Sequence, residues 1–265
     1  MTDVKHIAIL SQVTAQAKTI RQQLSQALTK HGFALVKAKP DLYITVGGDG
    51  TFLHHVRSLN YPQTPFIGIN AGSLGFFQEV EARNIKEFAQ DLKQRHYNLV
   101  ALPLLAVSID GHSQTVALNE VVIERASARA VHLEVKIDGQ VFEKFVGDGL
   151  IVATPQGSSA YSSAAGGAVI PFGLKLMQLV PSNPHDSTMY ISIRSPLILA
   201  DHSVVTIRAH QDKLRPFRVV ADGGLVASRQ QSQVKIMLSR RCIYLMRTHR
   251  FNYYTRLAHK MIRRH

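Results

Sequence analysis

The chain has 265 residues, a length that suits two domains or one large one. Its composition, 45% hydrophobic and 18% charged, excludes an intrinsically disordered chain. Cys242 is the one cysteine, which excludes an intrachain disulfide and a cysteine-based metal cluster and favours a cytoplasmic protein.

The net charge of +13 is concentrated towards the C-terminus. Residues 212–265 contain 13 Lys and Arg against 2 Asp, so this segment alone carries +11. Such a charge indicates a polyanionic partner, either a nucleic acid or a polyphosphate small molecule, or else a solvated basic face at a subunit boundary. Composition leaves these three interpretations open.

Neither apolar stretch of the sequence predicts a membrane span. The run Ile7–Leu10 is too short for a signal peptide. The 26 residues of Gly149–Leu174 carry no charge, but they include two prolines, four serines and five glycines. Because a lipid-facing helix does not tolerate this composition, we interpret the segment as buried or ligand-facing.

The first hundred residues alternate between strand and helix patterns, which predicts an α/β domain over residues 1–100 with a parallel sheet covered on both sides. A basic turn and a glycine, Lys30-His31-Gly32, mark the end of the first helix. The predicted strands are Val4–Leu10, Phe33–Lys37, Asp41–Val46 and Pro65–Ile69, and the predicted helices are Val13–Leu28, Phe52–Leu59 and Glu81–Arg95.

After Pro103 the pattern changes to a period of two, which predicts a β-rich, sandwich-like domain over residues 101–248. Turn pairs are expected at Asp110-Gly111 and Asp138-Gly139. Apolar residues at helical spacing over Phe251–Ile262 predict a C-terminal helix, within 249–265, that packs back on the first domain. The predicted strands are Val131–Ile137, Gln140–Val146, Leu150–Ala153, Ser203–Ala209, Phe217–Ala221 and Val234–Leu238.

A glycine-rich turn, Gly47-Gly48-Asp49-Gly50-Thr51, ends one of the predicted parallel strands. Ligands of α/β sheets bind at this end of a strand. Adjacent glycines allow the backbone to approach a ligand and its N–H groups to converge on phosphate oxygens. The Asp49 carboxylate could accept a proton from a hydroxyl or bind Mg²⁺. The spacing differs from that of the P-loop and of the dinucleotide fingerprint.

A second glycine-flanked carboxylate, Gly147-Asp148-Gly149, lies in the β-rich half and precedes the segment Thr154–Tyr161. Small hydroxyl residues after Gly157 offer donors and acceptors at a predicted helix start. The alternative is a buried helix of small residues, packed closely through Gly166-Gly167.

The pair Asn119-Glu120 is predicted inside a strand, where an amide beside a carboxylate suits a base edge or a ribose. The alternative is an outward polar pair on an edge strand. The 13 histidines show no paired ligand spacing, so no histidine metal site is expected. The sequence has no Gly-x-Ser-x-Gly elbow, which excludes a hydrolase of that type.

In combination these motifs resemble the NAD kinase family over most of the chain. Gly-Gly-Asp-Gly alone is shared with lipid kinases and sugar phosphokinases. The Asn-Glu pair followed by Asp148-Gly149-Leu150 and by Thr154-Pro155 through Tyr161 is more specific. The matching segments are Gly47–Thr51, the loop from Gly68-Ile69-Asn70 to Leu74-Gly75-Phe76, Asn119-Glu120 and Gly147–Gly167.

The resemblance implies a two-domain enzyme that transfers a phosphoryl group from ATP or polyphosphate to the 2′-hydroxyl of the adenosine ribose of NAD, giving NADP. It implies Mg²⁺ or another divalent cation, carried by ATP and with Asp49 as a further candidate ligand, and a homotetramer or homodimer. No membrane partner is expected. Asp49 and Asp148 are expected to face one cleft that binds the dinucleotide.

The resemblance also assigns roles to residues. Asp49 matches the catalytic aspartate, and Asp222 is a further candidate contact. The matching phosphate loop is Gly47, Gly48, Gly50 and Thr51. The positions that match NAD-binding residues are Asp49, Gly50, His54, Phe76, Asn119, Glu120, Asp148, Ser158, Ser159, Ala160, Tyr161 and Ala164.

The chain departs from the family pattern at four positions. Ser159 replaces a threonine, Ala164 a serine, Val146 a basic residue, and Gly224 the amide of an Asp-Gly-Gln stretch. These changes weaken or redirect the expected NAD contacts. One alternative function is a kinase of a lipid or sugar, which has no use for the Asn-Glu pair. The other is a nucleic-acid-binding protein using Arg240–Arg264, which we disfavour because few aromatic side chains there could stack on bases.

Overall fold

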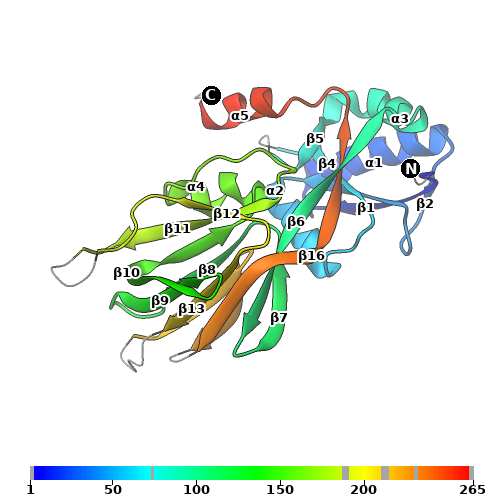
Figure 1. Ribbon diagram of the computed structural model, residues 1–265. Coiled ribbons are helices and arrows are strands. Elements are labelled where there is room, and N and C mark those ends of the chain that lie inside the picture. Colours follow the sequence, from blue (N-terminus) through cyan, green and yellow to red (C-terminus); the bar gives the residue numbers. More distant parts are fainter. Residues whose placement is uncertain (1–2, 73–74, 187–190, 210–214, 230–231, 263–265) are drawn as a thin grey trace. The chain divides into compact units, whose positions relative to one another are not determined.

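The structure is a computed structural model that describes residues 3–72, 75–186, 191–209, 215–229 and 232–262 (Figure 1). The chain forms two compact units, one of residues 1–101 with 242–265 and the other of residues 102–241. Each unit has its own hydrophobic core. The domain boundaries predicted from the sequence stay a prediction, because compactness does not test independent folding.

The first unit is an α/β layer built on parallel strands in the order β5-β4-β3-β1-β2. The strands are β1 (His6–Ser11), β2 (Ala34–Leu35), β3 (Leu42–Gly47), β4 (Phe66–Asn70) and β5 (Gln78–Glu81). The helices are α1 (Ala15–Lys30), α2 (Asp49–Ser58), the short 3₁₀ helix η1 (Ala82–Asn84), α3 (Ile85–Lys93) and α5 (Tyr253–Met261).

Both faces of this sheet are covered. Apolar side chains of α1 and α3, including Leu24 and Phe88, pack with Ile67 in one core cluster. Successive residues of a strand point to opposite faces, so Phe66 points away from that cluster. Its ring packs against Phe52 of α2, with 5.6 Å between the ring centroids. The predicted α/β layer with a parallel sheet is confirmed.

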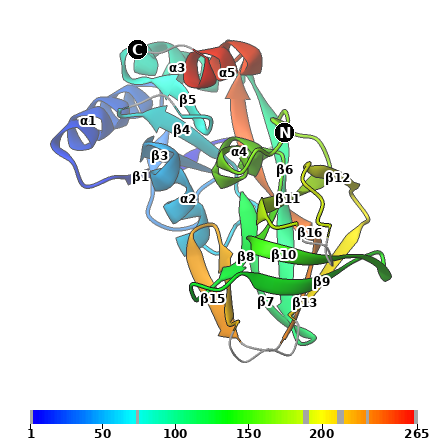
Figure 2. The ribbon, with the colours of Figure 1, turned by 90° about the vertical axis from the view of Figure 1, so that its left-hand side faces the viewer.

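The second unit is almost entirely antiparallel strand, in the order β15-β14-β8-β10-β9-β13-β16, and Figure 2 shows β8, β10 and β9 as neighbours. The predicted β-rich half is confirmed. The strands are β6 (Tyr97–Ile109), β7 (His112–Ala117), β8 (Glu120–Arg125), β9 (Val131–Ile137), β10 (Gln140–Ala153), β11 (Leu176–Pro184), β12 (Leu197–Ala200), β13 (Val204–Ala209), β14 (Phe217–Ala221), β15 (Gly224–Arg229) and β16 (Gln233–Thr248), and the short helices are η2 (Gln156–Ser159) and α4 (Tyr161–Ala164).

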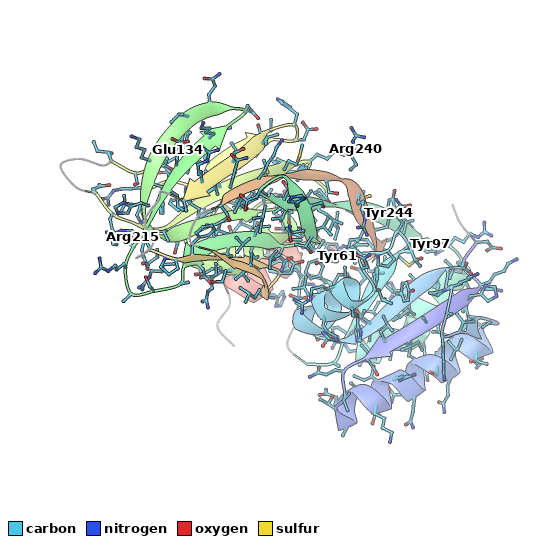
Figure 3. The ribbon with its side chains drawn as sticks, turned by 90° about the horizontal axis from the view of Figure 1, so that it is seen from below. Tyr61, Tyr97, Glu134, Arg215, Arg240 and Tyr244 are labelled. Atoms are coloured by element: carbon cyan, nitrogen blue, oxygen red, sulfur yellow. The ribbon has the colours of Figure 1, made fainter. Side chains whose placement is uncertain are left out.

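Buried and exposed side chains of the two units are drawn in Figure 3, in which Tyr97 marks the first unit and Glu134 the second. Tyr97, at the start of β6, is 5% exposed and belongs to the core of the first unit. Glu134 lies on the solvated side of β9, where it pairs with Lys136 at 3.4 Å. This alternation is the period of two that predicted β9.

Several elements differ from the sequence prediction, and the predicted strands Gln140–Val146 and Leu150–Ala153 form the single strand β10. The predicted strand Phe33–Lys37 is reduced to the two residues of β2, and β5 was not predicted, because its buried residues Gln78 and Glu79 are polar. The pair Asn119-Glu120 does not lie inside a strand, since β7 ends at Ala117 and β8 begins at Glu120. No helix in the part of the chain that the structure describes is long and apolar enough to cross a membrane.

Candidate functional site

Asp49 is the first residue of α2 and follows directly on β3, as the glycine turn predicts. Gly48 is the N-cap residue, and the first N–H groups of a helix have no acceptor within the helix. A Cβ atom built on Gly48 or Gly50 would meet no atom of the described structure within 4 Å. The backbone of this turn is therefore open to a ligand.

The Asp49 carboxylate is fixed by three donors. The backbone N–H groups of Phe76 and Phe77 donate to its two oxygens at 2.9 and 3.0 Å. The Lys260 ammonium donates to Oδ2 at 2.9 Å. A Cβ atom at Gly75 would lie 2.1 Å from Asp49 Oδ1, so only glycine lets the loop come this close. The Asp49 side chain stays 24% exposed.

A buried ion pair ties the loop that follows Gly75 to the C-terminal segment. The Arg247 guanidinium pairs with Glu79 at 2.9 Å and donates to the Phe76 carbonyl at 3.1 Å. Burial lowers the pKa of Arg247, and the Glu79 carboxylate opposes this shift. Arg256 of α5 donates to the Gly75 carbonyl at 3.2 Å. These contacts hold in place the two N–H groups that fix Asp49.

Of the apolar residues that predicted α5, Tyr254 is 68% and Met261 43% exposed, and Leu257 and Ala258 are half-buried. Arg256 and Lys260 project from one side of the helix at a spacing of four residues. The sequence analysis did not name them, because it treated them as part of a general basic region. The i, i+4 spacing of two cations was the available signal.

The other predicted residues of this unit vary in accessibility. His54 is exposed on α2, and the Thr51 hydroxyl reaches Gln12 at 3.5 Å. Phe76 is 2% exposed, and the Lys260 ammonium lies 4.8 Å from the centre of its ring. Ser73 and Leu74, in the loop that resembles the family, lie outside the described residues.

In the second unit, Asp222 fixes the turn that carries Asn119 and Glu120. Its carboxylate accepts the N–H groups of Leu118 and Asn119, each at 2.7 Å, and that of Glu120 at 3.4 Å. A carboxylate aimed at three backbone donors shapes the turn. The sequence motif around Asp222 therefore has a structural role that the family comparison did not predict.

The segment after β10 is shaped against the same turn. The Thr154 hydroxyl donates to the Leu118 carbonyl at 2.6 Å, and the Gln156 amide donates to the same oxygen at 2.9 Å. A Cβ atom at Gly157 would lie 2.0 Å from the Asn119 carbonyl oxygen. The two sequence motifs of this unit therefore form one structure around Asn119.

Asn119 and Glu120 are 5% and 8% exposed. Among the described residues, Asn119 Oδ1 and Glu120 Oε2 have no hydrogen-bond partner. Burial, and secondarily the Asp222 carboxylate, raise the pKa of Glu120 to about 8. Unpaired buried polar atoms are costly, so their presence indicates a ligand with complementary donors and acceptors.

Asp148 lies where β10 changes partner, because β10 pairs with β9 up to Gly147 and with β8 from Gly149. The Arg125 guanidinium pairs with Asp148 at 2.7 Å, and the Asn183 amide donates to it at 2.9 Å. Tyr161 and Arg218 join these residues around an open pocket of about 460 Å³. The sequence analysis did not name Arg125, whose guanidinium supplies the cation beside Asp148.

The small residues after Gly157 divide into two groups. Ser158 is fully buried, and its hydroxyl donates to the Ile170 carbonyl at 3.2 Å and accepts its N–H at 2.9 Å, which favours a structural role. Ser159 and Ala160 are half-buried, and Ala164 is exposed.

Asp49 and Asp148 belong to different units, so their common cleft stays a prediction.

No group of three or more His, Cys, Asp or Glu side chains within the described ranges is arranged to bind a metal ion. A phosphate-bound Mg²⁺ does not need such a group, because it uses one or two carboxylates together with substrate oxygens.

Comparison with known proteins places these motifs in one family. A family model for the ATP-NAD kinase N-terminal domain matches residues 4–97, and one for the C-terminal domain matches residues 118–248. The chain is 40% identical over 187 residues to the NAD kinase of Finegoldia magna. The aligned residues cover 68% of each of the two chains. It is 34% identical over 211 residues to NAD kinase 1 of Oceanobacillus iheyensis, covering 77% of this chain and 79% of the relative.

Two solved structures share the fold. Yeast NADH kinase complexed with NADH has a TM-score of 0.84 at 20% identity, over 99% of this chain and 88% of that one. The NAD kinase from Archaeoglobus fulgidus in complex with ATP has a TM-score of 0.73 at 22% identity, over 96% of each chain. From the family models and the curated relatives, we conclude that the chain belongs to the NAD kinase family.

Proposed function

We propose that this NAD kinase family member transfers the γ-phosphoryl group of ATP to the 2′-hydroxyl of the adenosine ribose of NAD and so produces NADP. The observation that carries the proposal is the placement of Asp49. Asp49 begins the helix α2 at the end of a parallel strand. Its carboxylate is partly exposed and is fixed by two backbone N–H groups.

The reaction itself needs a well-placed acceptor for one proton. The ribose 2′-oxygen attacks the γ-phosphorus, the bond to the bridging oxygen breaks, and its electron pair leaves with ADP. A carboxylate offers about four acceptor positions, and three of those on Asp49 are occupied. We assign the remaining position, on Oδ1, to the 2′-hydroxyl, which Asp49 orients and from which it accepts the proton.

The open glycine turn is the proposed phosphate site. Backbone N–H groups at the start of α2 point towards any anion placed above Gly48 and Gly50, and the helix dipole favours negative charge there. A Mg²⁺ ion bound together with ATP would neutralise part of the phosphate charge. Because Asp49 already binds an ammonium group, we propose that the metal ion enters on ATP and that Asp49 is not its ligand.

Residues of the second unit are the proposed adenosine and ribose contacts. Asn119 Oδ1 accepts and a protonated Glu120 can donate, because burial raises the pKa of Glu120 to about 8. Asp148 and Tyr161, which line one pocket, are the proposed contacts for the rest of NAD.

Acceptor specificity separates this function from a lipid or sugar kinase. Purified protein should transfer label from γ-labelled ATP to NAD and to neither a diacylglycerol nor a hexose. Parallel reactions with inorganic polyphosphate, and with NADH in place of NAD, define the donor and the acceptor further. Labelling of the lipid or the sugar in preference to NAD contradicts the proposal.

We also propose that the chain assembles as a homodimer or homotetramer. Val141 and Phe142, at a bulge in the hairpin between β9 and β10, are 59% and 42% exposed. Apolar side chains grouped on a surface favour a protein contact. Light scattering on the purified chain should give two or four times the monomer mass, and substitution of both residues by serine should lower that mass.

A further inference from the structure

Lys260 has been described so far only as one of the three donors that fix Asp49. Its ammonium group contacts Asp49 Oδ2 at 2.9 Å and lies 4.8 Å from the centre of the Phe76 ring. The Lys260 side chain is 34% exposed. Phe76 and Phe77 already hold the Asp49 carboxylate with their N–H groups. Two neutral N–H donors already position Asp49, so positioning alone does not require a cation here.

The negative charge of the product explains why an ammonium group lies beside Asp49. If the proposed function holds, the reaction replaces a neutral 2′-hydroxyl beside Asp49 with a phosphate dianion. A carboxylate repels that dianion at contact distance, and a neighbouring ammonium group offsets the repulsion. An ammonium has three donors, of which one contacts Asp49, so others remain for phosphate oxygens.

We propose that Lys260 is the binding residue for the 2′-phosphate, which it contacts as the phosphoryl group arrives and while NADP is bound. This inference rests on the proposed function. The two arginines nearby are committed to other contacts. Arg247 is buried against Glu79, and Arg256 donates to the carbonyls of Gly75 and Glu79. Lys260 has the flexible stem and the exposure that the transfer of a contact from Asp49 to a phosphate requires.

Binding of the two dinucleotides gives a test that does not depend on turnover. NAD and NADP differ only in the 2′-phosphate. Isothermal titration should show that Lys260→Ala weakens NADP binding by roughly tenfold or more, the usual effect of one charged hydrogen bond, and changes NAD binding by less than about twofold. Lys260→Arg should retain much of the NADP affinity.

The matched control is Lys18→Ala, an exposed lysine of α1, which should change neither affinity. Turnover gives a second measurement, since added ethylamine should partly restore NADP formation by Lys260→Ala. Equal losses of NAD and NADP affinity, or no loss of either, overturn the inference. A wild-type chain that binds NAD but forms no NADP from ATP contradicts the proposed function instead. In that case the effect of Lys260→Ala on NADP affinity, compared with its effect on NAD affinity, still decides the role of Lys260.

Discussion

At the scale of single residues, Glu120 links the candidate site to stability. Its pKa is raised from 4.5 to about 8, chiefly by burial. The folded state therefore binds one more proton than the unfolded state between these values, and stability falls as the pH rises from about 4.5 to about 8. Glu120→Gln removes this dependence, because a neutral amide does not titrate.

Thermal unfolding of the wild type and of Glu120→Gln from pH 5 to pH 9 tests this prediction. The variant should gain stability relative to the wild type as the pH rises and reach its full advantage above pH 8. Glu134→Gln, on the solvated side of β9, is the matched control and should follow the wild type. An advantage of Glu120→Gln that does not vary with pH contradicts the assignment.

Residue identities also show the limit of the sequence analysis. Spacing alone located the glycine turn, Asp49, the Asn-Glu pair and Asp148, because each motif is local. It could not locate Lys260, which contacts Asp49 across 211 positions of the chain. Asp222 was named as a candidate contact from the resemblance, but its hold on the Asn119 turn, 103 positions away, was not predicted. Contacts of this kind depend on the fold, because a local pattern can mark a basic helix face but does not say which distant residue it meets.

At the scale of elements, the loop from Gly75 to Phe77 decides where the Asp49 carboxylate lies. Gly75→Ala places a methyl group 2.1 Å from Asp49 Oδ1 and must displace it. We expect turnover to fall by roughly 100-fold, as small displacements of reacting groups do, with a modest loss of stability.

Gly111→Ala is the control for that loss of stability. Gly111 has a φ of +82° in an exposed turn between β6 and β7, so alanine is strained there, although its Cβ would meet no described atom within 4 Å. It should lower the melting temperature and leave NADP formation intact. If Gly75→Ala keeps wild-type turnover, the loop does not position Asp49.

Elements with strong periodicity were predicted well, including α1, β9 and β14. The failures have physical causes. In β5 the buried positions are polar, and α5 docks through cations and an aromatic ring instead of an apolar stripe. Hydrophobic patterning does not report contacts of either kind.

At the scale of the whole molecule, the change from alternating helices and strands to a period of two predicted an α/β half and a β-rich half. The family models match the chain in the same two parts, residues 4–97 and 118–248. Composition did not predict how the basic C-terminal segment is used. Part of that charge lies beside Asp49, at Arg247, Arg256 and Lys260, while Lys213, Arg263 and Arg264 lie outside the described residues.

The central claim is that Asp49 acts on the 2′-hydroxyl of NAD, and NADP formation by Asp49→Asn tests it most directly. The variant should fold like the wild type, as judged by thermal unfolding. It should form NADP from ATP and NAD roughly 100- to 10,000-fold more slowly, the usual effect of losing an acid–base residue. Asp201→Asn, an exposed aspartate of the second unit, should be fully active. NADP formation by Asp49→Asn at a rate near that of the wild type would contradict the account.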